Sequence, residues 1–330
     1  MDINKIKVIV VGATGLVGRE MLKILSEINF PIENVSGAAS AYSECCRINY
    51  GEKHEVVVQD LGKVNFKDYD VALFSAGSDI SEKYVPKAID AGCYVIDNTS
   101  FFRMRSDVPL VIPEININAV GSSKLIANPN CSTIQAVLPL KPLHDLFKLK
   151  DVVFSTYQSA SGAGKDGLRE LEEQFNAFNE KKHIECNIFQ HQLAYNVIPI
   201  IGSTDVSNYT VEELKMINET KKILSLPDIS VTATCVRVPV IVSHAVSVTA
   251  YFKYTVNMYE ALLALSKHPG ISFSDKHITP IDVVGKNDVF VTRLRQVPEP
   301  GNGITFWCVA DNIRKGAALN AVQILQKLCE

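Results

Sequence analysis

From Lys7 to about residue 128, short apolar runs alternate with segments of helical periodicity. The runs Lys7–Val11 and Val71–Phe74 are continuous and β-branched, which is typical of strands covered on both faces. Apolar residues recur at helical spacing over Glu20–Ile28 and Ser81–Ala91. The alternation predicts an α/β fold with a Rossmann-type, doubly wound parallel sheet and right-handed crossovers. Further strands are expected at Val35–Ala39, Val56–Val58 and Tyr94–Asp97.

The pattern changes after Asn128. Three longer runs alternate between apolar and polar residues, at Val152–Gln158, Ile229–Val238 and His244–Tyr254. Because such alternation is typical of a sheet with one covered face, and helical segments separate the runs, we expect an α+β domain with a mixed or antiparallel sheet. An amphipathic helix is expected over Ile313–Leu328.

These patterns also place the domain boundaries. We expect one domain to contain residues 1–128 together with 312–330, with the last helix packed back on the first domain. The second domain then covers residues 129–311. The chain has 330 residues, of which 47% are hydrophobic, and this is enough for two domains that each have a core.

Charge and cysteine usage narrow the class of protein. A formal net charge of -3 gives no general attraction for nucleic acid or for an anionic membrane. No window contains the ~18 uncharged apolar residues of a membrane helix, and Met1–Lys7 lacks the features of a signal peptide. The eight cysteines form no CxxC pair, and no Cys/His set has zinc-site spacing. We therefore expect a cytoplasmic protein with reduced thiols and no metal.

A glycine turn joins the first expected strand to the first helix. Gly12, Gly15 and Gly18 have the spacing G-x-x-G-x-x-G. Glycine lets the backbone approach a pyrophosphate, and the helix N-terminus offers free N–H groups and the positive end of a dipole. A tight structural turn is the alternative, but the position between strand and helix favours nucleotide binding.

The residues after the second strand indicate which nucleotide is bound. NAD sites usually carry an acidic residue here, which binds the ribose 2′-hydroxyl. In this chain Val35–Ala39 is followed by Ser40-Ala41-Tyr42-Ser43, which contains no acidic residue. The run favours NADP, with the 2′-phosphate held by Ser40, Ser43 and backbone N–H groups, and with Arg47 as a further candidate.

Cys131 differs from the other cysteines in its position. Leu125–Gln135 is typical of a strand, a turn and a helix, so that Cys131 lies where the helix begins. A helix N-terminus favours the thiolate, and the N–H groups there could hold an oxyanion together with the Asn130 side chain. Beside a nucleotide-binding domain, such a thiolate indicates chemistry on a carbonyl: a thiohemiacetal, hydride transfer and a thioester. An inert thiol in a turn is the alternative.

Two residues on the later strands are candidates to work with this thiol. His244 shares a strand face with apolar residues, and so does Arg237 on the preceding strand. Since only a short connection separates them, we expect adjacent strands that direct both side chains into one pocket, where the cation implies a bound or buried anion. A histidine satisfied within the core is the alternative.

Three further polar features complete the candidates. Arg103 follows the strand end Asn98-Thr99-Ser100, where the ligands of parallel sheets gather. Glu212 and Lys215 share one helix face, although a solvated ion pair would have the same spacing. Ser159–Gly164 directly follows a strand and is either a second glycine loop or an ordinary flexible turn.

Four motifs, in this order, resemble the aspartate-semialdehyde dehydrogenase family. They are Gly12–Gly18, Asn128–Thr133, Gln158–Gly162, and Cys235–Pro239 with His244. The resemblance runs from about residue 5 to the last residue and includes Asp311–Ala318. It implies reversible reductive dephosphorylation of L-aspartyl 4-phosphate to L-aspartate 4-semialdehyde with NADPH, in the biosynthesis of lysine, diaminopimelate, threonine and methionine. It further implies a homodimer, formed through the second, catalytic domain.

The resemblance also assigns roles to single residues. Cys131 would be the nucleophile and His244 the acid/base, while Gln158 and Arg237 would hold the substrate, with Glu212 near its amino group. The phosphate would be bound by Arg103, Lys215 and Asn130. Cofactor contacts would come from Thr14, Gly15, Leu16, Val17, Ser161, Gly162 and Asn312, in addition to Gly12, Ser40 and Ser43 of the nucleotide motifs.

One position departs from the family pattern. Many relatives have Ser-Ala-Arg-Ser at the 2′-phosphate site, where this chain has Tyr42 in place of the arginine. Tyrosine cannot form an arginine fork on a phosphate. We therefore expect weaker discrimination between NADP and NAD than in arginine-bearing relatives, with NAD also used.

Three alternative functions agree less well with these residues. N-acetyl-γ-glutamyl-phosphate reductase would share the domains and the thiol, but its acylated amine would not need Glu212. A sugar-phosphate dehydrogenase such as the glyceraldehyde-3-phosphate enzyme is disfavoured by the order and spacing of Cys131 and His244. A catalytically silent nucleotide-binding or redox-sensing module is disfavoured because Gln158 and Arg237 occur together with both.

Overall fold

The computed structural model describes residues 5–330, which divide into two compact units. The first unit runs to Asn130 and is completed by Ala317–Glu330, and the second is Cys131–Gly316. Each unit has its own sheet and its own buried apolar residues. No helix within residues 5–330 is long and apolar enough to cross a membrane.

The first unit contains a seven-stranded sheet with the order β3-β4-β2-β1-β5-β6-β7. Neighbouring strands are parallel except β3 and β4, which are antiparallel. The predicted doubly wound parallel sheet is confirmed. The strands are β1 (Val8–Val11), β2 (Val35–Ala39), β3 (Arg47–Tyr50), β4 (His54–Asp60), β5 (Val71–Phe74), β6 (Tyr94–Asp97) and β7 (Leu125–Ala127).

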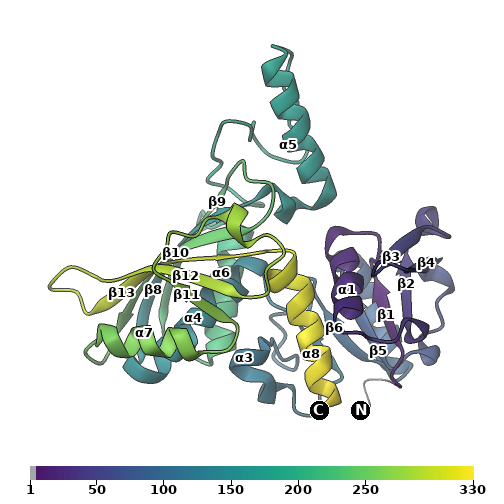
Figure 1. Ribbon diagram of the computed structural model, residues 1–330, viewed down its shortest axis with the longest axis horizontal. Coiled ribbons are helices and arrows are strands. Elements are labelled where there is room, and N and C mark those ends of the chain that lie inside the picture. The colour runs from purple at the N-terminus through teal and green to yellow at the C-terminus, as the bar shows by residue number, and fades with distance from the viewer. Residues whose placement is uncertain (1–4) are drawn as a thin grey trace. The chain divides into compact units, whose positions relative to one another are not determined.

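Helices cover this sheet, and every residue of β1 is fully buried, as its continuous apolar run predicted. The apolar faces of α1 and α8 pack against each other and contribute to one core with β1, β2 and β5 (Figure 1). The helices of the unit are α1 (Leu16–Glu27), α2 (Ser78–Asp90), α3 (Pro113–Asn116) and α8 (Leu319–Cys329).

The edge strand β3 was not expected from the sequence. It has four residues, of which only Ile48 and Tyr50 are buried, so its hydrophobic pattern is too short to stand out. It forms a hairpin with β4, and β4 pairs on its other side with β2. As a result Asp60, the last residue of β4, pairs with Ala39 at the end of β2.

The second unit contains a six-stranded sheet with the order β11-β12-β13-β10-β8-β9. Pairs β8–β9 and β11–β12 are parallel and the others antiparallel, which confirms the predicted mixed sheet. The strands are β8 (Leu149–Gln158), β9 (Ser230–Arg237), β10 (His244–Phe252), β11 (Ile271–Ser274), β12 (Val289–Gln296) and β13 (Gly303–Ala310). The helices are α4 (Cys131–Phe147), α5 (Gly164–Asn179), α6 (Val211–Leu224) and α7 (Met258–Lys267).

The strand order corrects one expectation. Strands β9 and β10 are not adjacent, because β8 lies between them. Since β8 is parallel to β9 and antiparallel to β10, the ends of β8 and β9 and the start of β10 meet at one edge of the sheet. Arg237, Gln158 and His244 therefore lie at that edge, with glutamine on the middle strand.

The C-terminal helix is also less regular than expected. Arg314–Ala318 is π-helical and leads into α8, where the sequence predicted one continuous helix over Ile313–Leu328. Asp311 fixes the start of this segment, because its Oδ1 accepts hydrogen bonds from the backbone N–H groups of Ile313 and Arg314, both at 3.0 Å. Short π-helical turns are frequent at functional sites.

Candidate active site

The glycine turn of the first unit lies between β1 and α1, as predicted, and its backbone approaches other backbone atoms closely. Gly12 has φ 87°, and a Cβ there would lie 2.3 Å from the carbonyl oxygen of Ser75. At Gly18 a Cβ would lie 2.2 Å from the carbonyl oxygen of Gly12. Gly15 is the N-cap of α1 and makes no side-chain cap bond. The first N–H groups of α1 are thus offered to a ligand rather than to a capping side chain.

A cavity of about 540 Å³ opens at this turn. It brings together four of the predicted cofactor residues, Gly12, Thr14, Gly15 and Ser40. Predicted residues Leu16, Val17 and Ser43 do not line it. The rest of its wall comes from Ala39, Ala41, Asp60, Leu61, Gly62, Ser75, Ala76, Ile80 and Tyr84. A glycine turn that leads into a helix N-terminus is the arrangement that binds the phosphates of a dinucleotide.

The charge of this cavity differs from what the sequence analysis expected. None of its lining residues is a lysine or an arginine, and Asp60 contributes a carboxylate. Arg47, the expected further cation, forms an ion pair of 3.1 Å with Glu55 on the exposed hairpin. Tyr42 is fully exposed. Sequence reasoning missed Asp60 because this residue ends β4, far along the chain from β2, and comes beside Ala39 only through the pairing of the two strands.

A second set of polar residues follows β6 in the same unit. Arg103 is buried, and its guanidinium donates hydrogen bonds to the backbone oxygens of Asn128 (2.9 Å) and Asn98 (2.8 Å). Asn130, the last residue of the unit, is also buried. Asp97 was not predicted: it accepts hydrogen bonds from Ser81 and Thr99, and burial raises the pKa of its carboxyl above the ordinary value.

The second unit gathers its predicted residues at the shared edge of β8, β9 and β10. Gln158 pairs directly with Arg237, and Ala245 pairs with Tyr157, which places His244 beside Gln158. All three side chains belong to the buried face of the sheet, and none exposes more than 7% of its surface. The three side chains therefore lie side by side, because the C-terminal ends of β8 and β9 meet the N-terminal end of β10.

Gln158 is linked to α6 by a chain of hydrogen bonds. Its Oε1 accepts a hydrogen bond from the Thr156 hydroxyl at 3.0 Å, and its Nε2 donates to Glu212 at 3.1 Å. The other oxygen of Glu212 forms an ion pair of 3.1 Å with Lys215. Glu212 is buried, whereas the lysine remains about one quarter exposed. The predicted pair is therefore part of a polar site, not a solvated surface pair.

Arg237 is held at the same edge. Its Nη1 donates a hydrogen bond of 2.7 Å to the backbone oxygen of Ser159, and its guanidinium lies 6.0 Å from the ring centre of Phe189. Burial lowers the pKa of the guanidinium, while the charges of Glu212 and of an ionised Cys131 oppose this shift. Arginine remains protonated in such a site. It is therefore a buried cation within electrostatic reach of the cysteine.

His244 is completely buried and is held through one ring nitrogen. Its Nδ1 accepts a hydrogen bond of 2.9 Å from the backbone N–H of Ser159 and lies 3.0 Å from the Ser159 hydroxyl. Its Nε2 has no hydrogen-bond partner among residues 5–330. Burial, reinforced by Arg237, lowers the pKa of the imidazole to about 3, so the ring is neutral at pH 7.

Cys131 is the first residue of α4 and is partly exposed. The π-helical turn lies against it, because a Cβ on Gly316 would be 2.9 Å from the Cβ of Cys131. Among the other cysteines, Cys93, Cys235 and Cys308 are buried, and burial raises the pKa of each thiol. The helix start thus separates Cys131 from the inert core thiols, as expected.

The remaining predicted cofactor residues, Ser161, Gly162 and Asn312, lie in the second unit. A Cβ on Gly162 would lie 2.7 Å from Nη1 of Arg237 and 3.2 Å from Nε2 of His244. The missing side chain leaves space between these two nitrogens. Ser161 and Asn312 are buried and bonded to each other. Ser159 was not named as a site residue, although its backbone contacts both Arg237 and His244 and its hydroxyl also lies 3.0 Å from His244 Nδ1.

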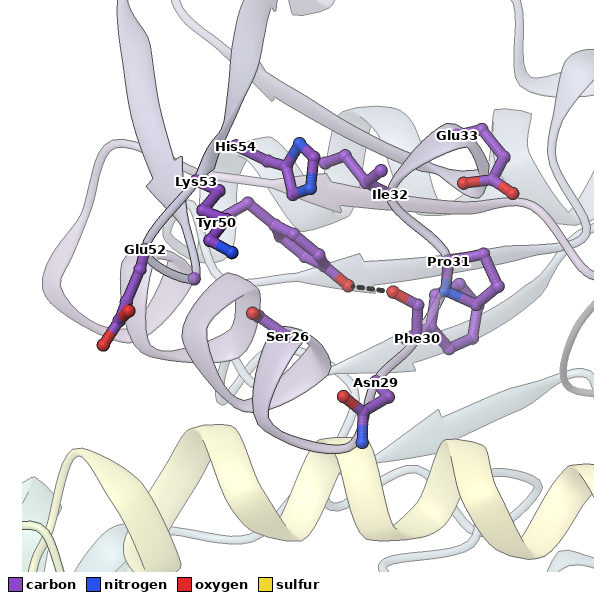
Figure 2. A pocket seen from close by; sticks show the side chains of 11 residues that line it. Ser26, Asn29, Phe30, Pro31, Ile32, Glu33, Tyr50, Glu52, Lys53 and His54 are labelled. Atoms are coloured by element: carbon purple, nitrogen blue, oxygen red, sulfur yellow. Dashed lines mark hydrogen bonds between the residues drawn. The ribbon is translucent and has the colours of Figure 1, made fainter.

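Another hollow, of about 600 Å³, lies at the opposite strand ends of the first unit. Figure 2 shows Tyr50 within it, donating a hydrogen bond of 2.7 Å to the backbone oxygen of Phe30. It contains none of the predicted site residues. No group of three or more His, Cys, Asp or Glu within residues 5–330 is arranged to hold a metal ion.

Comparisons with known proteins show the family of the chain. Residues 7–123 match the family model described as semialdehyde dehydrogenase, NAD binding domain, and residues 140–315 match semialdehyde dehydrogenase, dimerisation domain. The aspartate-semialdehyde dehydrogenases of Campylobacter jejuni and Bacillus subtilis are 45% and 42% identical, over 99% and 97% of this chain and 98% and 96% of theirs. Aspartate semialdehyde dehydrogenase II of Vibrio cholerae, also solved as a complex with ASA, has a TM-score of 0.94 and 41% identity, with 98% of both chains covered.

Fold and site define an oxidoreductase with a nucleotide-binding unit and a second unit that carries a cysteine at a helix N-terminus. Two domain models in the expected order, together with relatives at 41–45% identity over nearly the whole chain, narrow that class. The chain belongs to the aspartate-semialdehyde dehydrogenase family.

Proposed function

We propose that the protein catalyses the reversible, phosphate-dependent conversion of L-aspartate 4-semialdehyde into L-aspartyl 4-phosphate with NADP. Its products would feed lysine, diaminopimelate, threonine and methionine biosynthesis. The observation that carries the proposal is the edge of the second sheet, where Arg237, Gln158 and His244 lie side by side, Gln158 is bonded to the Glu212 carboxylate, and Arg237 lies within electrostatic reach of Cys131.

The charges at this edge fit the substrate. Aspartate semialdehyde carries a carboxylate and an ammonium group, and a buried guanidinium and a buried carboxylate recognise these two ends. Arg237 would donate two parallel hydrogen bonds to the substrate carboxylate. Glu212, oriented by Gln158, would accept hydrogen bonds from the substrate ammonium group. For the phosphate, the family resemblance assigns Arg103, Asn130 and Lys215. An acylated amine would leave the buried Glu212 without a cationic partner from the substrate, which disfavours the N-acetyl-γ-glutamyl-phosphate reductase alternative.

Cys131 would carry the reacting group. Its thiolate adds to the aldehyde carbon to give a thiohemiacetal, and loss of a hydride from that carbon gives a thioester. Phosphate then attacks the thioester, releasing aspartyl phosphate and the thiolate. His244 would act as the acid/base at the reacting oxygen. The N–H groups at the start of α4 would donate further hydrogen bonds to the same oxygen. The dinucleotide supplies the hydride acceptor, and Gly12, Thr14 and Gly15 would bind its pyrophosphate.

Cofactor choice forms a separate part of the proposal. Ser40 and Ser43 would bind a 2′-phosphate, but no lysine or arginine lines the cavity and Tyr42 stands where many relatives have arginine. We expect NADP use with weak discrimination, so that NAD is also accepted.

A homodimer would form through the second unit. One face of its sheet packs against α4 and α6, whereas Val153, Tyr157 and Trp307 stay partly exposed on the other. The ring centres of Tyr157 and Trp307 lie 5.2 Å apart, and such an aromatic pair is suited to an interface.

One assay tests the reaction. Purified protein should oxidise aspartate semialdehyde only when both phosphate and a nicotinamide dinucleotide are present. Cys131→Ala should abolish the activity while the circular dichroism spectrum and thermal midpoint stay unchanged. Cys45→Ala, which removes an exposed thiol, is the matched control and should remain active. Equal activity without phosphate, or an active Cys131→Ala variant, would contradict the proposal.

A further inference from the structure

Arg237 is contacted at two points by one irregular segment of the second unit. Residues 185–198, the covering segment, follow α5 and contain no helix or strand. Ile198, at the end of the covering segment, exchanges two backbone hydrogen bonds with Arg237, of 2.8 and 2.9 Å. Earlier in the segment, the ring centre of Phe189 lies 6.0 Å from the guanidinium carbon of Arg237. The covering segment therefore lies against both the backbone and the charged end of this arginine.

Two buried side chains of α5 hold the covering segment in place. Glu170 exposes 5% of its surface, and its carboxylate accepts hydrogen bonds from the consecutive backbone N–H groups of residues 187–189. Gln174, one turn further along the helix, accepts from the N–H groups of Leu193 (2.7 Å) and Ala194 (3.1 Å). Its amide nitrogen donates to Glu170 at 3.2 Å. Both halves of the segment are thus bonded to one face of α5.

The carboxylate of Glu170 is matched to this task. An unpaired buried charge is costly, and a carboxylate offers acceptors on both of its oxygens. Oε2 accepts from the N–H groups of Asn187, at 2.8 Å, and Ile188. Oε1 accepts from that of Phe189 at 3.1 Å. A glutamine would place its donating nitrogen against at least one of these N–H groups, so the bonds need the carboxylate and hold the segment on its path.

The ring of Phe189 is fixed by packing as well. Phe189 is buried and belongs to an apolar cluster with Ala160 and Leu171. A Cβ on Gly167 of α5 would lie 3.3 Å from Cζ of the ring, so the glycine leaves the room that the ring occupies. A guanidinium near an aromatic ring gains electrostatic attraction, and the gain is larger where water is excluded. The ring thus stabilises the buried Arg237 in one place.

We propose that Glu170 and Phe189 are positioning residues, which hold Arg237 ready for the substrate carboxylate. Glu170 sets the path of the covering segment and, through it, the place of the Phe189 ring. That ring and the carbonyl oxygen of Ser159, which accepts from Nη1 at 2.7 Å, orient the guanidinium before the substrate arrives. A long side chain that is ordered in advance loses less conformational entropy on binding. The inference rests on the proposed function and deepens the role of Arg237 there.

Phe189→Leu tests the ring while it keeps an apolar side chain in the cluster. We expect KM for aspartate semialdehyde to rise about fivefold, with kcat and KM for phosphate within about twofold of the wild type. Phe273→Leu, on the edge strand β11, is the matched control and should change none of these constants. An unchanged KM for the aldehyde in Phe189→Leu would overturn the inference. An inactive wild type would instead refute the proposed function.

A double-mutant cycle separates positioning of Arg237 from a merely structural role. If the ring acts through the guanidinium, its removal should matter little once the guanidinium is absent. In an Arg237→Ala background we therefore expect Phe189→Leu to change kcat/KM by less than about twofold. A loss as large as in the wild-type background would show that the ring acts independently of Arg237, contrary to the inference.

Glu170→Gln tests the carboxylate that holds the covering segment. We expect KM for aspartate semialdehyde to rise about tenfold, because a donor then faces a backbone N–H group, and KM for phosphate to stay within about twofold. Glu172→Gln removes the same charge from an exposed position of α5 and should have no effect. A folded Glu170→Gln variant with the KM of the wild type would refute the role of Glu170. If this variant does not fold, the cycle with Phe189→Leu decides the question.

Discussion

Each unit has one sheet edge with candidate site residues, and the two edges offer different parts of the polypeptide. In the first unit, Gly12, Gly15 and Gly18 shape the turn, and the groups offered to a ligand are backbone N–H groups. In the second unit, buried side chains from separate strands, Arg237 and His244 among them, offer the polar groups. The first edge depends on local backbone shape and the second on strand pairing.

This difference determines which changes each edge tolerates. At the glycine turn, side chains are excluded by backbone atoms, whereas the exposed residues nearby can vary. At the other edge, each polar group is buried against a partner, so removal of one leaves another unsatisfied. We therefore expect the larger catalytic losses at the second edge and losses of stability at the first.

The largest effect is expected at Arg237. Arg237→Ala removes the buried cation and leaves the substrate carboxylate unpaired, so kcat/KM should fall by about a thousandfold. Arg237→Lys keeps the charge but not the fork and should recover part of the loss. Steady-state kinetics and the thermal midpoint measure both. A folded alanine variant with kcat/KM within tenfold of the wild type would show that the substrate carboxylate is held elsewhere.

Gly12→Ala should act on stability instead. The new methyl group would meet the backbone at Ser75, in a conformation that only glycine adopts readily, at a cost of about 2–4 kcal/mol in the free energy of unfolding. Gly77→Ala is the matched control, since its φ of 95° is similar but a Cβ there meets nothing within 4 Å. Denaturant titration compares the two. If both variants lost the same stability, strain at φ alone would be the cause and the close approach would not matter.

His244 should make the second edge sensitive to acid. Its pKa is about 3 in the folded chain against an ordinary 6.5, so below pH 6.5 the unfolded chain binds a proton that the native one does not. Stability is therefore present above pH 6.5 and is lost as pH falls toward 3, by about 2 kcal/mol between pH 7 and pH 5. His244→Gln should remove this part of the slope in urea titrations. His183→Gln, at an exposed position, should leave it in place.

The smallest effect is expected at Tyr42, near the cavity of the first unit. Tyr42 is fully exposed, so Tyr42→Arg should leave stability unchanged. The guanidinium restores a partner for the 2′-phosphate and should raise the NADP over NAD ratio of kcat/KM by about tenfold. Tyr42→Gln is the uncharged control. If the wild type already strongly prefers NADP and the arginine changes nothing, other groups bind the phosphate.

The sequence predicted the local features of both edges well. The turn at Gly12, the helix start at Cys131 and most strands followed from short-range patterns, and the fold class is confirmed. Pairing between distant runs was harder to predict. Strand β3, which forms a hairpin with β4, was too short to recognise. The position of Asp60 beside Ala39 was also missed, because it results from the pairing of β4 with β2. The strand β8 was predicted, but its position between the strands of Arg237 and His244 was likewise not foreseen.

The residue roles came from the family resemblance more than from periodicity. Arg237 and His244 stood out as polar residues on apolar faces, but nothing in their spacing named their partners. Ser159 contacts Arg237 through its carbonyl and His244 through its backbone N–H, groups that every residue type carries, and only its hydroxyl, 3.0 Å from His244 Nδ1, depends on residue type. The amide of Asn312 gains its orientation only through the folded backbone at Ser243.

The most direct test of the account is the mass of Cys131 during the reaction. Enzyme mixed with aspartyl phosphate in the absence of any nicotinamide dinucleotide should accumulate an aspartyl thioester, and quenched protein should show that added mass on the peptide that contains Cys131. Cys131→Ser should show no hydroxylamine- and thiol-sensitive adduct. An adduct on another residue, or turnover without acylated Cys131, would contradict the claim that this sulfur is the nucleophile.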